Sequence, residues 1–216
     1  RPDNAVGQFR MEGCKADLGL QDMTLAEARE AGAETLVIGV ANRGGKISAA
    51  WKEVLIEALN MGFDIASGLH NLLRNEADLV AAAEANGTTL HDVRVPSVEY
   101  PIADGKKRSG KRVLAVGTDC SVGKMYTALA LDEAMREKGM KSTFRATGQT
   151  GILITGEGVP LDAVIADFMA GSVEYLTPAN DDDHWDIIEG QGSLFHVSYS
   201  GVTMALIHGG QPDALI

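Results

Sequence analysis

The sequence has 216 residues, of which 45% are hydrophobic and 23% charged, and its formal net charge is −11. This composition is typical of a globular protein with one large or two small domains. The acidic balance argues against nucleic acid or an anionic membrane as a partner, and no stretch is apolar for long enough to span a membrane. The only cysteines, Cys14 and Cys120, are too few for a disulfide framework and wrongly spaced for zinc. We therefore expect a reducing, cytoplasmic setting and no metal site.

The first half of the chain alternates expected helices and strands. After a loop at residues 1–20, Thr24 and Glu27 predict a capping box for a helix over 22–31. The continuous apolar run 34–40 predicts a buried parallel strand. Further helices are expected at 51–61 and 76–86, and further strands at 63–67 and 91–95. Such alternation predicts right-handed βαβ units and a parallel sheet.

A segment rich in proline and basic residues separates the two halves. It contains Pro96 and Pro101 and then five basic residues between positions 106 and 112. We place the domain boundary near Asp104, which gives domains at 1–104 and 105–216. The basic residues are most simply a solvated linker, and the alternative is that some of them face an anionic ligand.

The second half repeats the α/β pattern. Strands are expected at 112–116, 143–146 and 185–189, and helices at 124–138, 161–170 and 200–208. Residues 213–216 begin another strand, and a parallel sheet is not expected to end halfway through a strand. Because the sequence also begins at Arg1 without a start methionine, we expect both ends to be incomplete.

The segment Gly117–Lys124 (GTDCSVGK) lies between an expected strand and an expected helix. Its backbone N–H groups, the helix end and the Lys124 ammonium predict a phosphate site; the alternative is a glycine-rich turn with a surface lysine. It departs from the Walker A pattern, because five residues separate its glycines and Met125 replaces the Ser/Thr that ligates Mg²⁺. The residues expected to bind the cofactor are Gly117, Thr118, Asp119, Cys120, Ser121, Val122, Gly123, Lys124, Met125 and Tyr126.

A second polar cluster follows the strand expected at 143–146. Ligands of open α/β sheets bind at the carboxyl ends of the strands, so this cluster should lie beside the phosphate loop. The residues expected to bind substrate are Thr147, Gly148, Gln149 and Thr150. The alternative is a polar turn that stabilises only itself.

A third cluster follows the strand expected at 185–189. Glu189 ends that strand, and a carboxylate there can bind a metal, act as a general base or orient an ammonium group. We assign Glu189 and His196 as the catalytic candidates, although a lone histidine is more often structural. Gln191 and Ser193 are expected to bind substrate, with Gly190 and Gly192 leaving room for it.

Two known families share these motifs. GTDCSVGK resembles the phosphate loop of dethiobiotin synthetase, and EGQGS resembles that enzyme's acidic motif. Longer segments resemble the D-glutamate (D-amino acid) N-acetyltransferases, a formerly uncharacterised P-loop family; these segments are 7–20, 117–131, 144–159, 184–196 and 208–215. The resemblance implies an N-terminal Rossmann-like domain followed by a P-loop NTPase-like α/β domain. It also implies acetyl transfer from acetyl-CoA to the amine of D-glutamate.

Three functional classes follow from these observations. The first is the N-acetyltransferase, with a small amino acid as substrate and acetyl-CoA as co-substrate. The second is a ligase or kinase of the dethiobiotin synthetase type, which would use ATP and Mg²⁺, and the third is a non-catalytic nucleotide-binding protein. Met125 favours the first class over the second, because the pyrophosphate of coenzyme A needs N–H donors and a lysine but no catalytic Mg²⁺. We also expect a homo-oligomer.

Overall fold

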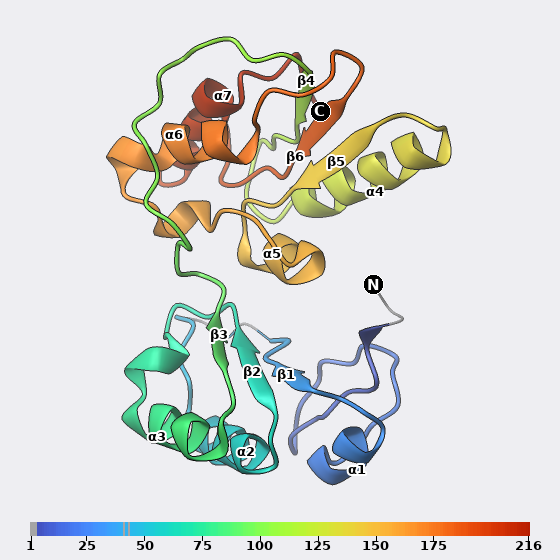
Figure 1. Ribbon diagram of the computed structural model, residues 1–216, viewed down its shortest axis with the longest axis vertical. Coiled ribbons are helices and arrows are strands. Elements are labelled where there is room, and N and C mark those ends of the chain that lie inside the picture. Colours follow the sequence, from blue (N-terminus) through green and yellow to red (C-terminus); the bar gives the residue numbers. More distant parts are fainter. Residues whose placement is uncertain (1–3, 41, 43) are drawn as a thin grey trace. The chain divides into compact units, whose positions relative to one another are not determined.

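The computed structural model describes residues 4–40, 42 and 44–216. The chain divides into two compact units, the first ending at Arg94 and the second beginning at Val95. Each unit combines helices with one parallel sheet (Figure 1), as the sequence predicted. No helix within the described ranges is long and apolar enough to cross a membrane.

The division between the units lies before the boundary expected at Asp104. The segment that follows Val95 packs on the second unit, where Tyr100 lies in a hydrophobic core. The N–H groups of Asp104 and Gly105 donate hydrogen bonds of 3.0 and 2.9 Å to the carboxylate of Glu174. These contacts assign the segment to the second unit rather than to a linker.

The first unit contains a three-stranded parallel sheet with the order β1-β2-β3. Its elements are α1 (Leu25–Glu30), β1 (Thr35–Val37), α2 (Ala49–Asn60), β2 (Asp64–Ser67), η2 (Leu73–Asn75), α3 (Ala77–Asn86) and β3 (Leu90–Asp92). Figure 1 shows α2 and α3 side by side against the strands. The predicted capping box is present, because Thr24 and Glu27 each bond to the other's backbone N–H.

The strand expected at 34–40 is shorter and less buried than its apolar sequence predicted. Leu36 and Ile38 pack against the core of the first unit, whereas Thr35 and Val37 are exposed. Within the described residues β1 pairs only with β2, so it is an edge strand with one packed face. An unbroken apolar run could not distinguish this arrangement from a strand buried on both faces.

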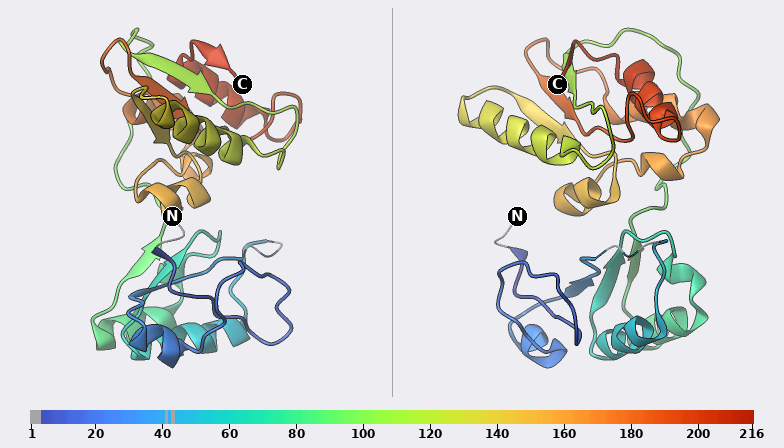
Figure 2. Two further views of the ribbon diagram at one scale, coloured as in Figure 1. Left: turned by 90° about the vertical axis from the view of Figure 1, so that its right-hand side faces the viewer. Right: turned by 180° about the vertical axis from the view of Figure 1, so that it is seen from behind.

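The second unit contains a four-stranded parallel sheet with the order β5-β6-β4-β7. Its elements are β4 (Lys111–Leu114), α4 (Lys124–Glu137), β5 (Ser142–Arg145), α5 (Gln149–Thr155), η3 (Leu161–Ala163), α6 (Ala166–Leu176), β6 (Trp185–Ile188), α7 (Ser200–Gly210) and β7 (Ala214–Leu215). Helix α4 covers one face of this sheet, and α6 and α7 pack together on the other (Figure 2).

Two elements of the second unit differ from the sequence prediction. The helix expected at 161–170 is divided into η3 and the later helix α6. Helix α5 was not predicted, because the residues after the strand at 143–146 were expected to form a polar cluster or turn.

The basic residues near the boundary include two arginines that form neither a solvated linker nor an anion site. Arg108 donates to the carbonyls of Thr177 and Gly209 at 2.7 and 2.6 Å. Arg112 is 2% exposed and donates to the carbonyl of Gly210 at 3.0 Å. These carbonyls lie at the C-terminal ends of α6 and α7, where a cation is favourable, so the two arginines fasten both helices to β4.

Candidate active site

Three loops meet at the carboxyl edge of the second sheet. They are the phosphate loop (117–124), the β5–α5 loop (146–148) and the β6–α7 loop (189–199). Because β5, β6 and β4 are adjacent parallel strands, their carboxyl ends lie side by side. Hydrogen bonds then join the β6–α7 loop to both of the others.

The phosphate loop presents backbone donors ahead of α4. The N–H groups from Ser121 to Met125 donate to no other residue in the part of the chain that the structure describes. Ser121 has a φ of 56° and Gly123 a φ of 95°, backbone angles that turn successive N–H groups toward a common point. The Lys124 ammonium donates to the Asp119 carbonyl at 3.0 Å. The loop therefore combines a helix N-terminus, free donors and one cation, which is the chemistry of a phosphate site.

Met125 lies where the Walker A pattern has a hydroxyl. Its side chain packs against the core beneath α4, a cluster that includes Val113, Ala128 and Ile187. A thioether held in this core cannot ligate a hard cation such as Mg²⁺. The neighbouring Tyr126 is instead 75% exposed. Its side chain lies at the surface, and its backbone forms part of the first turn of α4.

Glu189 is buried between the second and third loops, with 4% of its surface exposed. Its Oε2 accepts hydrogen bonds from the N–H groups of Thr147 and Gly148 at 2.8 and 3.0 Å. The hydroxyl of Thr147 donates to the Glu189 carbonyl at 2.8 Å. The second oxygen, Oε1, has no hydrogen-bond partner among the residues described here. One oxygen is thus anchored by the protein, and the other is left for a ligand or a proton.

Burial raises the pKa of Glu189 from its ordinary value of 4.5 to about 7. Loss of solvation is the largest cause, because a charged carboxylate is disfavoured away from water. The two N–H donors of Thr147 and Gly148 oppose this effect and lower the pKa. A carboxyl group that titrates near neutral pH is suited to accept a proton during catalysis.

Two glycines allow the close packing around Glu189. A Cβ on Gly151 would lie 2.3 Å from Glu189 Oε2, so any side chain there would displace the carboxylate. A Cβ on Gly190 would lie 1.7 Å from the carbonyl oxygen of Ala115, the residue that follows the adjacent strand β4. Gly190 is therefore required for the close approach of its backbone to that of Ala115.

Ser193 is fully buried and uses its hydroxyl entirely within the protein. The hydroxyl donates to the Thr118 carbonyl at 3.0 Å and accepts from the N–H groups of Phe195 and His196 at 3.3 and 3.0 Å. A serine hydroxyl has one proton to donate and two lone pairs, so none remains for substrate. Thr147, also fully buried, donates to Glu189 from its N–H and from its hydroxyl. The Ser193 hydroxyl thus holds the site in shape, and the expected contact of Thr147 with substrate stays a prediction.

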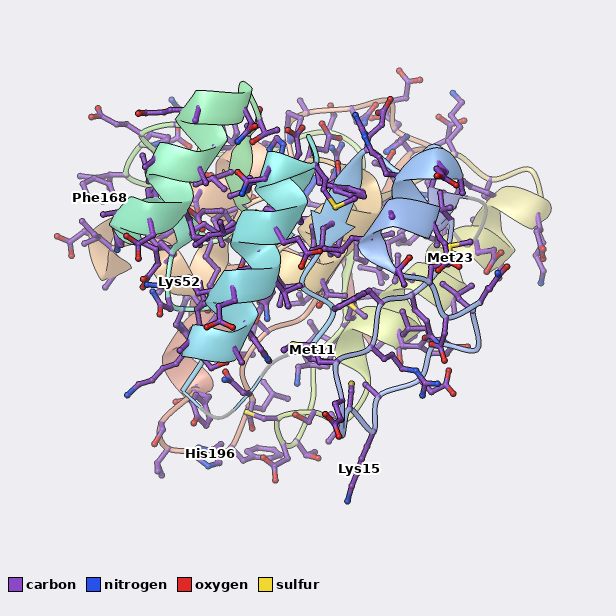
Figure 3. The ribbon with its side chains drawn as sticks, turned by 90° about the horizontal axis from the view of Figure 1, so that it is seen from below. Met11, Lys15, Met23, Lys52, Phe168 and His196 are labelled. Carbon is purple, nitrogen blue, oxygen red and sulfur yellow. The ribbon has the colours of Figure 1, made fainter. Side chains whose placement is uncertain are left out.

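Among the described residues, no hydrogen bond or ion pair joins the side chains of His196 and Glu189. Figure 3 shows His196 at the margin of its unit, on the loop that leads into α7. Its ring lies against Tyr199 with the centroids 4.6 Å apart, and its Nδ1 accepts from the N–H of Ser198 at 3.2 Å. When the ring is neutral, this contact favours the tautomer that is protonated on Nε2.

The remaining expected substrate residues differ in accessibility. Gln149 and Gln191 are half-buried, and Thr150 is exposed on the first turn of α5. The sequence reasoning missed Thr203 on α7, which is 2% exposed and donates to the carbonyl of Gln191 at 2.8 Å. Nothing in a helical sequence marks such a residue, because its partner is brought to it only by the fold.

No group of three or more histidine, cysteine, aspartate or glutamate side chains that could hold a metal occurs in the described ranges. In the first unit, Asn42, Arg43, Gly44 and Gly45 follow the strand expected at 34–40, and this loop is a weaker candidate for substrate or interface contacts. Its Arg43 lies outside the described residues.

Comparisons with known proteins agree with this architecture. Residues 9–96 match the model of a Rossmann-like domain of unknown function (DUF1611_N), and residues 101–216 match a P-loop domain of unknown function (DUF1611_C). The crystal structure of a DUF1611 family protein from Anabaena variabilis superimposes with a TM-score of 0.82 at 40% sequence identity. That match covers 90% of this chain and 57% of the other.

Two curated relatives bear the name D-glutamate N-acetyltransferase. The relative from Tritonibacter scottomollicae is 80% identical over all 216 residues, and the relative from a Pseudoalteromonas species is 49% identical over the same length. The chain spans 65% of the length of each relative. By its matches over both units, the chain belongs to the DUF1611 family, in which a Rossmann-like domain precedes a P-loop domain.

Proposed function

We propose that this chain carries the phosphate-binding and proton-transfer residues of an N-acetyltransferase that moves the acetyl group of acetyl-CoA to the amine of D-glutamate. The observation that carries the proposal is the buried Glu189, which has one oxygen anchored and a pKa near 7 beside the phosphate loop. The names of the two curated relatives support the same activity and the same acceptor.

The residues of the site fit the phosphates of coenzyme A. The N–H groups from Ser121 to Met125 are free to donate, and Lys124 adds a positive charge next to them. Their anion-binding chemistry requires no metal ion. Bound acetyl-CoA would supply the acetyl group as a thioester.

Glu189 would act as the general base. An ammonium group must lose a proton before its nitrogen can attack a carbonyl, and Oε1 is the oxygen free to receive that proton. The N–H groups of Thr147 and Gly148 hold Oε2, so the carboxylate cannot turn away. His196 is the second acid–base candidate, and Gln191 is the half-buried amide nearest Gly148.

A ligase or kinase that uses Mg-ATP is the second candidate, because the loop sequence resembles that of dethiobiotin synthetase. Met125 counts against it, since the side chain packs into the core and offers no oxygen to Mg²⁺. A non-catalytic nucleotide-binding protein would have no need for a carboxyl group held near neutral pKa.

The net charge of −11 supports a small-molecule substrate rather than a nucleic acid or an anionic membrane. We further propose a cytoplasmic setting, which the pair of unlinked cysteines supports. A homo-oligomer is the remaining part of the proposal, and light scattering on the full-length protein tests it.

The decisive experiment uses the full-length protein with D-glutamate and either acetyl-CoA or Mg-ATP. We expect free thiol to appear in the reaction of D-glutamate with acetyl-CoA, without Mg-ATP. EDTA should not change its rate. L-Glutamate in a parallel reaction tests the handedness of the acceptor. Phosphate release that strictly requires Mg-ATP and D-glutamate, with no thiol formed, would establish the ligase instead.

A further inference from the structure

The β6–α7 loop is joined to the phosphate loop at two successive residues. The N–H of Leu194 donates to the Gly117 carbonyl at 2.9 Å, and the hydroxyl of Ser193 donates to the Thr118 carbonyl at 3.0 Å. Both acceptors lie at the start of the phosphate loop. The position of that loop therefore depends on the β6–α7 loop as well as on its own strand and helix.

The same hydroxyl also fixes the backbone at His196. Ser193 Oγ accepts from the N–H of His196 at 3.0 Å, and the His196 carbonyl accepts from the N–H groups of Tyr199 and Ser200 at 3.0 and 3.1 Å. The ring is held in turn by the N–H of Ser198 and by Tyr199. Backbone and imidazole are thus both fixed, and Ser193 is the residue that connects them to the phosphate loop.

We propose that Ser193 is a positioning residue, which sets the phosphate loop and the His196 imidazole in a fixed relation through one buried hydroxyl. The proposal rests on the proposed function, in which the phosphate loop holds the coenzyme and His196 is an acid–base group. It assigns Ser193 no contact with substrate, because all of its hydrogen-bonding capacity is used within the protein.

Removing the hydroxyl would leave unpaired groups on both sides. The Thr118 carbonyl would lose a donor, and the N–H groups of Phe195 and His196 would lose their acceptor. Unpaired polar groups in a buried site are unfavourable, so the loops would shift toward water or toward new partners. A shift at either end would separate the phosphate site from the imidazole.

Ser172 offers a matched control in the same unit. It is also fully buried, and its hydroxyl donates to the Met169 carbonyl at 2.8 Å within α6. Ser172→Ala therefore removes a buried serine hydroxyl away from all three loops of the site. An effect confined to Ser193→Ala cannot come from the loss of a buried hydroxyl alone.

The first test measures the affinity for coenzyme A by calorimetry on the full-length protein. We expect Ser193→Ala to weaken binding by about tenfold, as the loss of one hydrogen bond to a repositioned loop implies. Ser172→Ala should leave the affinity within about twofold of the wild type. Equal affinities for the wild type and Ser193→Ala would overturn the phosphate-loop half of the proposal. If Ser193→Ala does not fold, Ser193→Cys retains the volume and a weak donor, and takes its place.

The second test is a double-mutant cycle with His196→Ala. We expect Ser193→Ala to lower kcat about tenfold in the wild type and less than twofold when His196 is already absent, because residues that act as a unit are not additive. The same factor in both backgrounds would show that Ser193 does not act through His196.

These results separate the inference from the proposed function. A wild-type protein that binds coenzyme A but transfers no acetyl group contradicts the proposed function alone. The imidazole NMR signals of His196 then replace kcat as the readout. They should shift in Ser193→Ala and not in Ser172→Ala, and unchanged signals would overturn the His196 half. A wild-type protein that does not bind coenzyme A overturns both.

Discussion

The carboxyl edges of the two parallel sheets use their polar groups differently. In the first unit, Asp92 at the end of β3 accepts from the N–H groups of Leu73 and Arg74 at 2.7 and 3.1 Å, and from the Arg74 guanidinium at 3.0 Å. Ser67 at the end of β2 accepts from the N–H of Leu69 at 3.2 Å. Ser67 thus bonds to the loop that follows its own strand, and Asp92 bonds to η2, which follows the neighbouring strand β2.

The second unit leaves donors and an acceptor unused at the same edge. No described residue accepts from the N–H groups between Ser121 and Met125, and none bonds to Glu189 Oε1. The two edges share a strand–loop–helix pattern, so the pattern alone does not make a site. A binding edge is distinguished by hydrogen-bonding groups that the loops position but do not satisfy.

The largest test of this contrast is Glu189→Gln, which keeps the shape of the side chain and removes its charge. If Glu189 is the base, we expect kcat for acetyl transfer to fall by roughly 10²–10⁴, while the affinity for coenzyme A stays the same. Steady-state kinetics on the full-length protein give the answer. A raised KM with little change in kcat would show that Glu189 only binds the ammonium group. His196→Ala is measured alongside, and full activity in Glu189→Gln with none in His196→Ala would transfer the role to the histidine.

The raised pKa of Glu189 predicts a pH dependence of stability that requires no catalysis. The folded protein favours the protonated form, because the pKa rises from 4.5 to about 7 on folding. The protonated Glu189 side chain makes its full contribution to the free energy of unfolding below about pH 4.5. That contribution, about 3 kcal/mol, is lost as the pH rises through 7. Denaturant unfolding at pH 5 and pH 8.5 should show the wild type losing stability relative to Glu189→Gln. A difference between the two proteins that does not change with pH would mean that Glu189 titrates normally.

The phosphate loop predicts the next largest effect. Lys124→Ala removes the cation beside the free N–H groups. We expect the free energy of binding coenzyme A to become less favourable by roughly 1.5–3 kcal/mol. Lys138→Ala is the matched control, because that lysine is exposed at the opposite end of α4. Calorimetry on both variants decides the matter. If the folded Lys124→Ala protein bound coenzyme A as tightly as the wild type, residues 117–124 would not be the phosphate-binding loop.

Periodicity and loop motifs predicted the order of most strands and helices, because local patterns determine these elements. They also placed Glu189 and Lys124 at one sheet edge, since adjacent parallel strands end together. The sequence did not reveal which polar side chains would form their hydrogen bonds within the protein rather than with a ligand. Ser193 and Thr147 were expected to face substrate, and both are buried with their hydroxyls bonded inside the protein.

Helix α5 shows the second limit of sequence reasoning. The residues after β5 were expected to form a polar cluster that binds substrate or a turn, and no helix was predicted there. The structure has a helix there, and Gly151 lies in it because the Glu189 carboxylate occupies the space of a Cβ. That requirement comes from a residue on another strand, which no local pattern contains.

The variant with the smallest expected effect lies at the carboxyl edge of the first sheet, where the polar groups are already hydrogen-bonded. Asp92 is 7% exposed, and its carboxylate holds the first residues of η2 through Leu73 and Arg74. Asp92→Ala should destabilise the first unit by about 1–2 kcal/mol, as expected for the loss of a capping side chain, and should leave the affinity for coenzyme A unchanged. Asp78→Ala, which removes an exposed carboxylate of α3, should change stability by less than about 0.5 kcal/mol. Thermal unfolding and calorimetry of the two variants measure both quantities. If Asp92→Ala abolished coenzyme binding while the protein remained folded, the first edge would itself be part of the site, and the contrast between the two sheets would fail.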